Sequence, residues 1–230
     1  ILYAAGWAWG FGPDGVHPKG DLNIDSLLVL VNTPVEISVV DTVAASFLIT
    51  KNRGQELDVN GIAKGYSVDL LGEFLQQRGI HNFMIEVGGE ITVRGVNRNG
   101  EKWHIGIDKP VDPSAERALL AIAEIDNRSM ATSGSYRKFY EEEGKRYSHT
   151  IDPFSGRPVN HNLLSATVLA PNCANADALA TAFMVMGVEK SKQFIDQHPE
   201  LQLDAYFIFA DGDALKTYIS PGLKKVLKEI

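Results

Sequence analysis

Apolar residues recur at helical spacing in one long stretch of the chain, residues 64–78. From Tyr66 to Leu75 they stand three or four positions apart, which places them on one face of a helix. Gly79 follows directly, and glycine is the residue that most often ends a helix. The pattern therefore predicts a helix over residues 64–78.

Further helices are predicted towards the end of the chain. One covers residues 176–186, with Asn175 as its N-cap, because an asparagine side chain accepts hydrogen bonds from the free N–H groups of a helix start. Gly187 is expected to end it, and another helix follows over residues 189–197. A short helix is expected to close the chain.

Strand signals outnumber these helices. Runs of strand length that are continuously apolar, or that alternate apolar and polar residues, occur at residues 26–31, 46–50, 83–87, 91–96, 103–107, 119–125, 164–169, 203–209 and 215–219. The pair Asp211-Gly212 lies between the last two runs and predicts a hairpin turn. Because strands and helices are mixed irregularly, the sequence predicts an α+β fold, a single domain over residues 1–230 around a largely antiparallel sheet with flanking helices.

Composition excludes several classes of protein. Apolar residues make up 44% of the 230 residues, which is too many for a disordered chain. The net charge is −7 and no dense run of Lys or Arg occurs, so nucleic acid is not an expected partner. The longest apolar runs are far shorter than the ~20 residues that cross a bilayer. Cys173 is the single cysteine, which excludes an internal disulfide and a zinc cluster of thiolates.

A loop with two glycines leads into the first predicted helix. It begins at Asp58 and contains Gly61, Lys64 and Gly65. The N–H groups of a helix start, together with the charge of Lys64, would attract a phosphate group. An ordinary turn with a solvated lysine explains the same residues, and the loop has neither the Walker A spacing nor the dinucleotide GxGxxG pattern. Both interpretations stay open at this level.

Two other stretches allow a ligand or a plain turn. Gly88 and Gly89 lie between two predicted strands, where glycine lets a flat or charged ligand approach the backbone or simply forms the turn. Residues 132–137 read as a hydroxyl-rich turn with Thr132, Ser133 and Gly134. Its hydroxyls and its arginine would bind a phosphate or position an acceptor group, or they bond their own backbone.

The remaining candidates are a histidine and an aspartate–threonine pair. His149 ends a strand-like run just before the turn that begins at Asp152, where a neutral imidazole accepts a proton near neutral pH or serves only in packing. Asp177 and Thr181 are four residues apart and share one helix face. Their oxygens suit Mg²⁺, although Asp177 would also favour the helix dipole and Thr181 would also bond back to a carbonyl.

Taken in order, these motifs resemble those of the ApbE-type FAD:protein FMN transferases. The matching stretches are residues 9–13, 58–69, 86–90, 103–110, 132–136, 148–158 and 176–182. The resemblance covers nearly the whole chain, and the ordered set is far more specific than any one motif. It implies an Mg²⁺-dependent enzyme that cleaves the pyrophosphate of FAD, passes FMN to a Thr or Ser hydroxyl of an extracytoplasmic acceptor protein, and releases AMP.

The resemblance also implies roles for individual residues. The metal site would consist of the side chains of Asp177 and Thr181 and a backbone carbonyl at Gly61. His149 would lie near the reacting phosphates and act as the general base for the acceptor hydroxyl. FAD would contact, or lie in a cleft lined by, Asp58, Lys64, Gly88, Gly89, Thr132, Ser133, Gly134 and the main chain near Ile151.

Members of this family carry a segment before the Trp-Gly-Phe-Gly motif that helps to hold FAD, and the present chain begins after it. We therefore expect an open flavin pocket and an unpaired sheet edge, which favours a homo-oligomer. The family pattern includes a leader or a lipid-anchor cysteine, so the expected location is the periplasmic side. The alternatives to FMN transfer are an FAD pyrophosphatase that gives FMN and AMP, and a non-catalytic flavin-binding domain.

Overall fold

The structure is a computed structural model that describes residues 24–41, 46–110, 118–135, 139–142, 145–148, 150–212 and 214–230. These residues form two compact units. The smaller unit contains the described parts of residues 1–58 and 139–160, and the larger unit contains those of residues 59–138 and 161–230. The expectation that residues 1–230 form a single domain stays a prediction.

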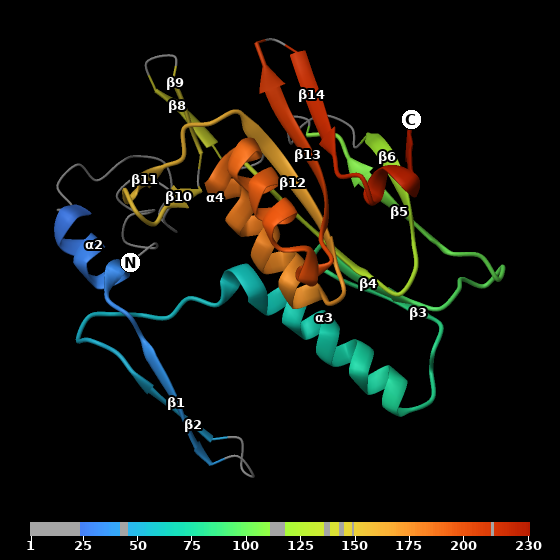
Figure 1. The fold of residues 1–230 in the computed structure, drawn as a ribbon, viewed down its shortest axis with the longest axis horizontal. Coiled ribbons are helices and arrows are strands. Elements are labelled where there is room, and N and C mark those ends of the chain that lie inside the picture. Colours follow the sequence, from blue (N-terminus) through green and yellow to red (C-terminus); the bar gives the residue numbers. More distant parts are fainter. Residues whose placement is uncertain are drawn as a thin grey trace. The chain divides into compact units, whose positions relative to one another are not determined.

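Six strands of the larger unit form one sheet in which every neighbouring pair is antiparallel. They are β3 (Phe83–Val87), β4 (Glu90–Arg94), β7 (Ser129–Gly134), β12 (Leu163–Ala170), β13 (Asp204–Asp211) and β14 (Ala214–Ile219). In space their order is β14-β13-β12-β7-β4-β3 (Figure 1). The hairpin predicted at Asp211-Gly212 is confirmed, because β13 and β14 pair on either side of it.

One face of this sheet packs against helix α4 (Cys173–Gln197), as Figure 1 shows. Ala131 of β7 and Val168 of β12 are paired neighbours that point to this face, where they share a core with Ala180 and Phe183 of the helix. Because side chains alternate along a strand, the next residue of each strand points the other way. The apolar residues of the six-stranded sheet therefore supply two cores rather than one.

The opposite face packs against a second, three-stranded antiparallel sheet. Its strands are β5 (Trp103–Asp108), β6 (Leu119–Ile125) and β15 (Leu227–Glu229), in the spatial order β15-β6-β5. Ile105 and Ala123 of this sheet share a core with Met130 and Leu169. The larger unit thus has three layers, which are a helical layer, the six-stranded sheet and the three-stranded sheet. This arrangement confirms the predicted α+β class and the largely antiparallel pairing.

Helix α3 (Asn60–Gln77) confirms the helix predicted over residues 64–78 and begins four residues earlier. Gly79 follows it with φ +76°, and its N–H donates to the carbonyl of Gln76, while the N–H of Ile80 donates to the carbonyl of Leu75. Those two bonds are the Schellman pattern of a helix end, which glycine favours because its backbone enters the left-handed region without strain.

The apolar residues that predicted α3 are not its packed face. Tyr66 is 56% exposed and Phe74 is 49% exposed. The buried positions of the helix are Gly65, Val68 and Gly72. Small residues on that face let the backbone of α3 come close to its neighbours, which matters for the site described below.

Helix α4 begins earlier than predicted. Its N-cap is Asn172 rather than Asn175, and the Asn172 side chain accepts a hydrogen bond from the N–H of Asn175 at 2.8 Å. Gly187 interrupts the helix with φ +76° and ψ +175°, so the break predicted there is confirmed, and the helix continues to Gln197. A 3-10 turn, η1 (Pro199–Leu201), connects it to β13.

The smaller unit contains helix α2 (Ile24–Asn32) and three two-stranded antiparallel hairpins among its described residues. The buried amide of Gln55 donates to the carbonyls of Leu30 and Thr33, which ties the end of α2 to the segment that follows the first hairpin. The hairpins pair β1 (Glu36–Asp41) with β2 (Ser46–Thr50), β8 (Phe139–Glu142) with β9 (Lys145–Ser148), and β10 (Ile151–Asp152) with β11 (Arg157–Pro158).

Three further local predictions were wrong. The strand-length run at residues 26–31 lies in α2, because a short apolar run fits a helix as well as a strand and its surroundings decide between them. Residues 132–134 belong to β7 rather than to a turn, since they pair with β12. The chain ends in a 3-10 turn, η2 (Leu223–Lys225), and strand β15 instead of a short helix.

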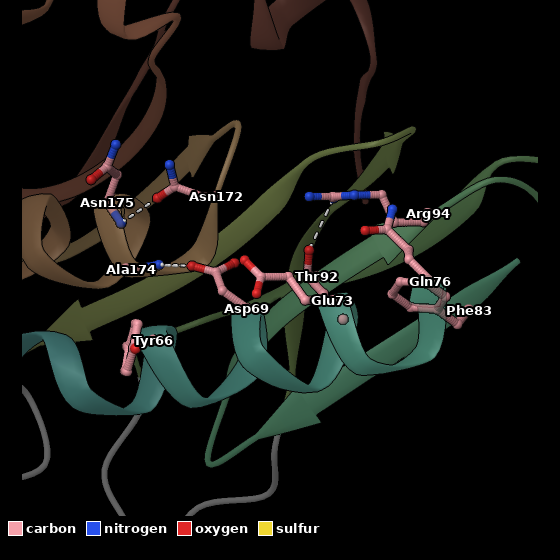
Figure 2. A pocket seen from close by; sticks show the side chains of 11 residues that line it. Tyr66, Asp69, Glu73, Gln76, Phe83, Thr92, Arg94, Asn172, Ala174 and Asn175 are labelled. Atoms are coloured by element: carbon pink, nitrogen blue, oxygen red, sulfur yellow. Dashed lines mark hydrogen bonds between the residues drawn. The ribbon is translucent and has the colours of Figure 1, made fainter. Parts of the chain in front are cut away.

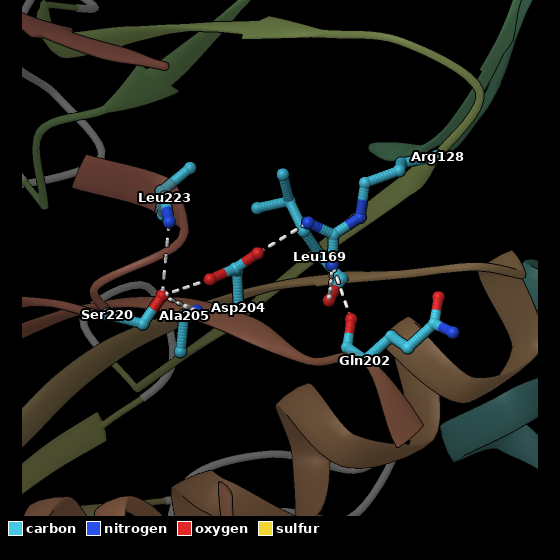
Figure 3. A network of polar contacts seen from close by, with 7 residues as sticks. All are labelled: Arg128, Leu169, Gln202, Asp204, Ala205, Ser220 and Leu223. Atoms are coloured by element: carbon cyan, nitrogen blue, oxygen red, sulfur yellow. Dashed lines mark hydrogen bonds and ion pairs between the residues drawn. The ribbon is translucent and has the colours of Figure 1, made fainter. Parts of the chain in front are cut away.

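A network of polar contacts joins strand ends of the larger unit (Figure 3). The guanidinium of Arg128 lies 2.5 Å from the carboxylate of Asp204 and donates to the carbonyls of Leu169 and Gln202. The hydroxyl of Ser220 donates to the second carboxylate oxygen of Asp204 at 2.6 Å. Both oxygens of this aspartate are used, so the network serves to hold strands together.

Cys173 provides a first test of the packing between α3 and α4. It is buried, and burial raises the pKa of its thiol to about 12, with the carboxylates of Asp69 and Glu90 adding to the shift. Because the thiolate fraction falls tenfold for each pKa unit, we expect the thiol of the folded chain at pH 8 to react with DTNB roughly 10³-fold more slowly than in concentrated urea. Equal rates in the two solutions would contradict the packing around this residue.

None of the helices in the described residues is long and apolar enough to cross a bilayer.

Candidate functional site

The site is built where α3 crosses α4, and Gly65 makes the crossing close. A Cβ atom on Gly65 would collide with the carbonyl of Cys173 and would lie 2.8 Å from the Cβ of Asp177. The N–H of Gly65 donates to Oδ2 of Asp177 at 2.9 Å. Asp177 is only 3% exposed, so its carboxylate is held inside the crossing by the backbone of the neighbouring helix.

Thr181 lies one turn further along α4 and continues the site. A Cβ atom on Gly61 would lie 3.6 Å from Cγ2 and 3.8 Å from Oγ1 of Thr181, so the first turn of α3 passes close to this side chain. The hydroxyls of Ser133 and Thr181 lie 3.2 Å apart. The structure therefore brings together Gly61, Asp177 and Thr181, the three residues predicted to hold a metal.

A charged pair lies beside them. The Nζ atom of Lys64 is 2.5 Å from Oε1 of Glu90, and a Cβ on Gly88 would lie 3.4 Å from Cδ of Lys64. Gly88 and Gly89 form the turn between β3 and β4 with φ +61° and +100°, which glycine adopts without strain. The turn thus places the backbone of Gly88 against the stem of Lys64.

Glu90 is a member of the site that sequence reasoning missed. It is 2% exposed, and its Oε2 atom is the buried side-chain oxygen of the described residues that has no hydrogen-bond partner. A buried carboxylate with a free oxygen is unusual, because such groups normally have partners. The feature of the sequence that could have identified Glu90 is its position directly after two glycines and at the start of a buried strand.

The two carboxylates share an electrostatic environment. Burial raises the pKa of Glu90, Lys64 acts in the opposite direction, and the charge of Asp177 raises it further. Burial also raises the pKa of Asp177, while the N–H of Gly65 and the charge of Lys64 lower it. The site therefore concentrates buried negative charge, which a cation bound there would stabilise.

The threonine, serine and glycine at the end of β7 do not all join this site. Ser133 points to the α4 face of the sheet, where it meets Thr181. Thr132 precedes it by one residue, so its side chain points to the other face, where its hydroxyl lies 2.9 Å from that of Thr167. Gly134 ends the strand beside Ser165.

The remaining predicted residues belong to the smaller unit or lie outside the described residues. Asp58 and Ile151 belong to the smaller unit, and Ile151 is buried in strand β10. Their contacts with FAD stay predictions. His149 and the Trp-Gly-Phe-Gly-Pro motif at residues 9–13 lie outside the described residues.

The donor set fits a magnesium ion. Within the described residues no group of three or more His, Cys, Asp or Glu side chains could hold a metal by itself. The site instead offers the carboxylate of Asp177 and the hydroxyl of Thr181, and Gly61 lies close to Thr181. Mg²⁺ prefers oxygen ligands and takes its remaining ones from waters or from substrate phosphates, so an incomplete protein shell suits it.

Lys64→Met tests the electrostatics of the site. Lys64 lies next to the buried Glu90, and its removal leaves that carboxylate without its cation, so we expect the free energy of unfolding to fall by about 2 kcal/mol at pH 7. Burial raises the pKa of Glu90 above its ordinary 4.5. The loss of unfolding free energy should therefore shrink as the pH falls towards this raised pKa, because the carboxylate takes up a proton and no longer needs a cation. Urea unfolding at several pH values measures it.

The matched control for that variant is Lys102→Met. Lys102 is equally exposed, but its partner Glu124 is half-exposed and 3.9 Å away, so removing this lysine should leave the unfolding free energy almost unchanged. Adding Glu90→Gln to Lys64→Met should restore the stability that was lost. A loss that is independent of pH, or that Glu90→Gln fails to restore, would contradict the assignment of Glu90 as a buried charge.

Comparisons with known proteins extend these observations. The chain matches the ApbE family over residues 2–207. It is 37% identical over 221 residues to the FAD:protein FMN transferase of Salmonella typhimurium and 38% identical over 226 residues to that of Vibrio cholerae. These alignments cover 95% and 96% of this chain but 61% and 64% of the relatives, so the chain spans less than two thirds of the length of the proteins it matches.

Solved structures agree with the sequence relatives. The flavin transferase ApbE from Vibrio cholerae superposes with a TM-score of 0.78 at 34% identity, over 98% of this chain and 69% of that one. The apo flavinyl transferase ApbE from Pseudomonas stutzeri superposes with a TM-score of 0.79 at 31% identity, over 98% of this chain and 67% of that one. Fold, sequence and the matched range together show that the chain belongs to the ApbE family.

Proposed function

We propose that this chain is the core of an enzyme that binds FAD with Mg²⁺ and transfers FMN to a Thr or Ser hydroxyl of an acceptor protein, with AMP as the leaving group. The observation that carries the proposal is the α3–α4 crossing, where Asp177, Thr181 and Gly61 meet beside Lys64. Relatives named FAD:protein FMN transferase support the same substrates. The family pattern of a leader or anchor supports an acceptor on the periplasmic side.

Asp177, Thr181 and the main chain of Gly61 would hold the metal in this proposal. When bound there, Mg²⁺ would neutralise negative charge on the pyrophosphate oxygens, including the charge that develops on the AMP leaving group. The burial of Asp177 and its bond from Gly65 keep its carboxylate in one orientation before any ligand arrives. Such preorganisation lowers the cost of binding the transition state.

Lys64 is the residue of the described site that would contact the pyrophosphate. Its side chain is 48% exposed, whereas the side chain of its partner Glu90 is buried. A lysine held at its inner side by a carboxylate keeps a fixed direction while it still has hydrogens to donate to a phosphate oxygen. Glu90 therefore orients Lys64, and the turn at Gly88 supports the stem of the side chain.

The acceptor hydroxyl must lose its proton as it attacks the phosphorus atom that belongs to the FMN half of FAD. We assign this step to His149, whose imidazole takes up a proton near neutral pH, a contribution of typically about 10²–10⁴ in rate. The bond from the hydroxyl oxygen to phosphorus forms while the bridging P–O bond to AMP breaks. Water in place of the hydroxyl would give free FMN and AMP.

One experiment separates these outcomes. The chain is incubated with FAD and MgCl₂ alone, and in parallel with an extracytoplasmic protein extract as a source of acceptors. AMP is quantified by chromatography, and peptide mass spectrometry locates FMN on Thr or Ser. We expect AMP and protein-bound FMN in the second arm only. Free FMN and AMP in both arms would show that the chain hydrolyses FAD and does not transfer FMN. Binding of FAD without release of AMP would refute catalysis.

A further inference from the structure

We propose that Asp69 is a positioning residue that sets the register between α3 and α4 and thereby places Asp177 and Thr181. Its role at the metal rests on the proposed function, whereas its role in the register does not. Figure 2 shows Asp69 on α3 with its carboxylate directed at the first turn of α4. Oδ1 accepts the N–H of Cys173 and Oδ2 accepts the N–H of Ala174, both at 2.8 Å.

These bonds are one step of a regular ladder between two antiparallel helices. Gly61 faces Thr181, Gly65 faces Asp177, and Asp69 faces Cys173. Each step advances four residues along α3 and goes back four along α4, so all three contacts lie on one face of each helix. A shift of one helix along the other would break every contact of the ladder at once.

The Gly65–Asp177 step carries one hydrogen bond to a carboxylate, and the Asp69 step carries two. Gly61 has no side chain with which to hold Thr181, and the close approach of Gly65 to Cys173 sets how near the helices come. A carboxylate that accepts two consecutive helix N–H groups also fixes the rotation of α4 about its axis. Asp177 lies one turn beyond these N–H groups and Thr181 lies two turns beyond, so their directions follow from the same anchor.

The same helix start offers a matched control. Asn172 also satisfies an N–H of the first turn, that of Asn175, but both residues belong to the start of α4, so this bond does not join the two helices. Removal of either side chain uncovers the start of α4. Only the removal of Asp69 also breaks hydrogen bonds between α3 and α4. Both residues line the same cavity of about 440 Å³, so solvent reaches the uncovered N–H groups in each case (Figure 2).

The test compares Asp69→Ala and Asp69→Asn with Asn172→Ala in the full chain, at a temperature where circular dichroism shows all of them folded. Mn²⁺ affinity, measured by electron paramagnetic resonance as a probe for the magnesium site, should fall by about 10-fold or more in Asp69→Ala, which is the range for residues that support metal ligands. Asp69→Asn, which keeps one acceptor oxygen, should lie between. Asn172→Ala should stay within about twofold of the parent chain.

Amide hydrogen exchange supplies a readout that needs no metal. The N–H of Gly65 is bonded to Asp177, so its exchange should accelerate at least about tenfold in Asp69→Ala and stay unchanged in Asn172→Ala. Equal effects of the two alanine variants on both readouts would overturn the positioning role. A parent chain that binds no Mn²⁺, with accelerated Gly65 exchange in Asp69→Ala only, would refute the proposed metal site and leave the register role standing.

Discussion

Asp177→Ala is expected to lower kcat/KM for FMN transfer by about 10³-fold and to remove its dependence on Mg²⁺. The reason is that Asp177 is the buried carboxylate of the proposed metal set, and the hydroxyl of Thr181 cannot bind a divalent cation by itself. The measurement is AMP release from FAD at several MgCl₂ concentrations. Mn²⁺ binding, followed by electron paramagnetic resonance, should be lost in parallel.

Two comparisons make this result specific. Asp196→Ala removes an exposed aspartate from the same helix and should leave both activity and Mn²⁺ binding unchanged. The fold of Asp177→Ala should persist, because the lost hydrogen bond from Gly65 is offset by the removal of a buried charge. If Asp177→Ala retains full Mg²⁺-dependent activity, the metal site lies elsewhere.

The second large effect is expected for Gly65→Ala. Alanine is normally the better helix residue, yet here a Cβ would collide with the carbonyl of Cys173 and press on Asp177. The atoms that this Cβ would meet are backbone atoms and a Cβ, which cannot move by a side-chain rotation. The two helices must therefore move apart. We expect the free energy of unfolding to fall by about 3 kcal/mol, at the upper end of the usual cost of overpacking. Urea unfolding followed by circular dichroism measures the loss.

Gly72→Ala is the control on the same helix. Gly72 is also buried, but a Cβ there would lie 3.6 Å from the ring of Phe83, which is an ordinary contact distance. This variant should gain up to about 1 kcal/mol from the better helix propensity of alanine. If both glycine variants change stability in the same direction, the close α3–α4 approach described at Gly65 is wrong. Because Gly65 bonds Asp177, its variant should also weaken Mn²⁺ binding.

The strand predictions succeeded where local chemistry and tertiary surroundings agree. The segments 83–87 and 119–125 have the predicted bounds, and in both of them apolar residues such as Phe83, Ala121 and Ala123 are buried while the glutamates are exposed. The segment 26–31 failed, since a leucine-rich run of that length satisfies both helix and strand. The N-cap of α4 was misplaced by three residues, because Asn172 and Asn175 are equally good caps locally.

The residues of the candidate site were likewise predicted only in part. The sequence singled out Gly61, Lys64, Asp177 and Thr181, and the fold brings all four to the α3–α4 crossing. It did not single out Glu90, since an acidic residue after a turn is usually solvated. Nor did it separate Thr132 from Ser133, because only the pairing of β7 determines which face each of them takes.

The sequence by itself determined the two long helices, most strands of the larger unit, the oxygen-rich chemistry of the candidate site and the likeness to a family, because spacing and residue type carry that information directly. Tertiary structure alone decided that the conspicuous apolar stripe of α3 is exposed and that its small residues are buried. It also decided that Asp69 meets a helix start 104 residues away. Those outcomes depend on how closely two helix backbones approach, and no local pattern records that distance.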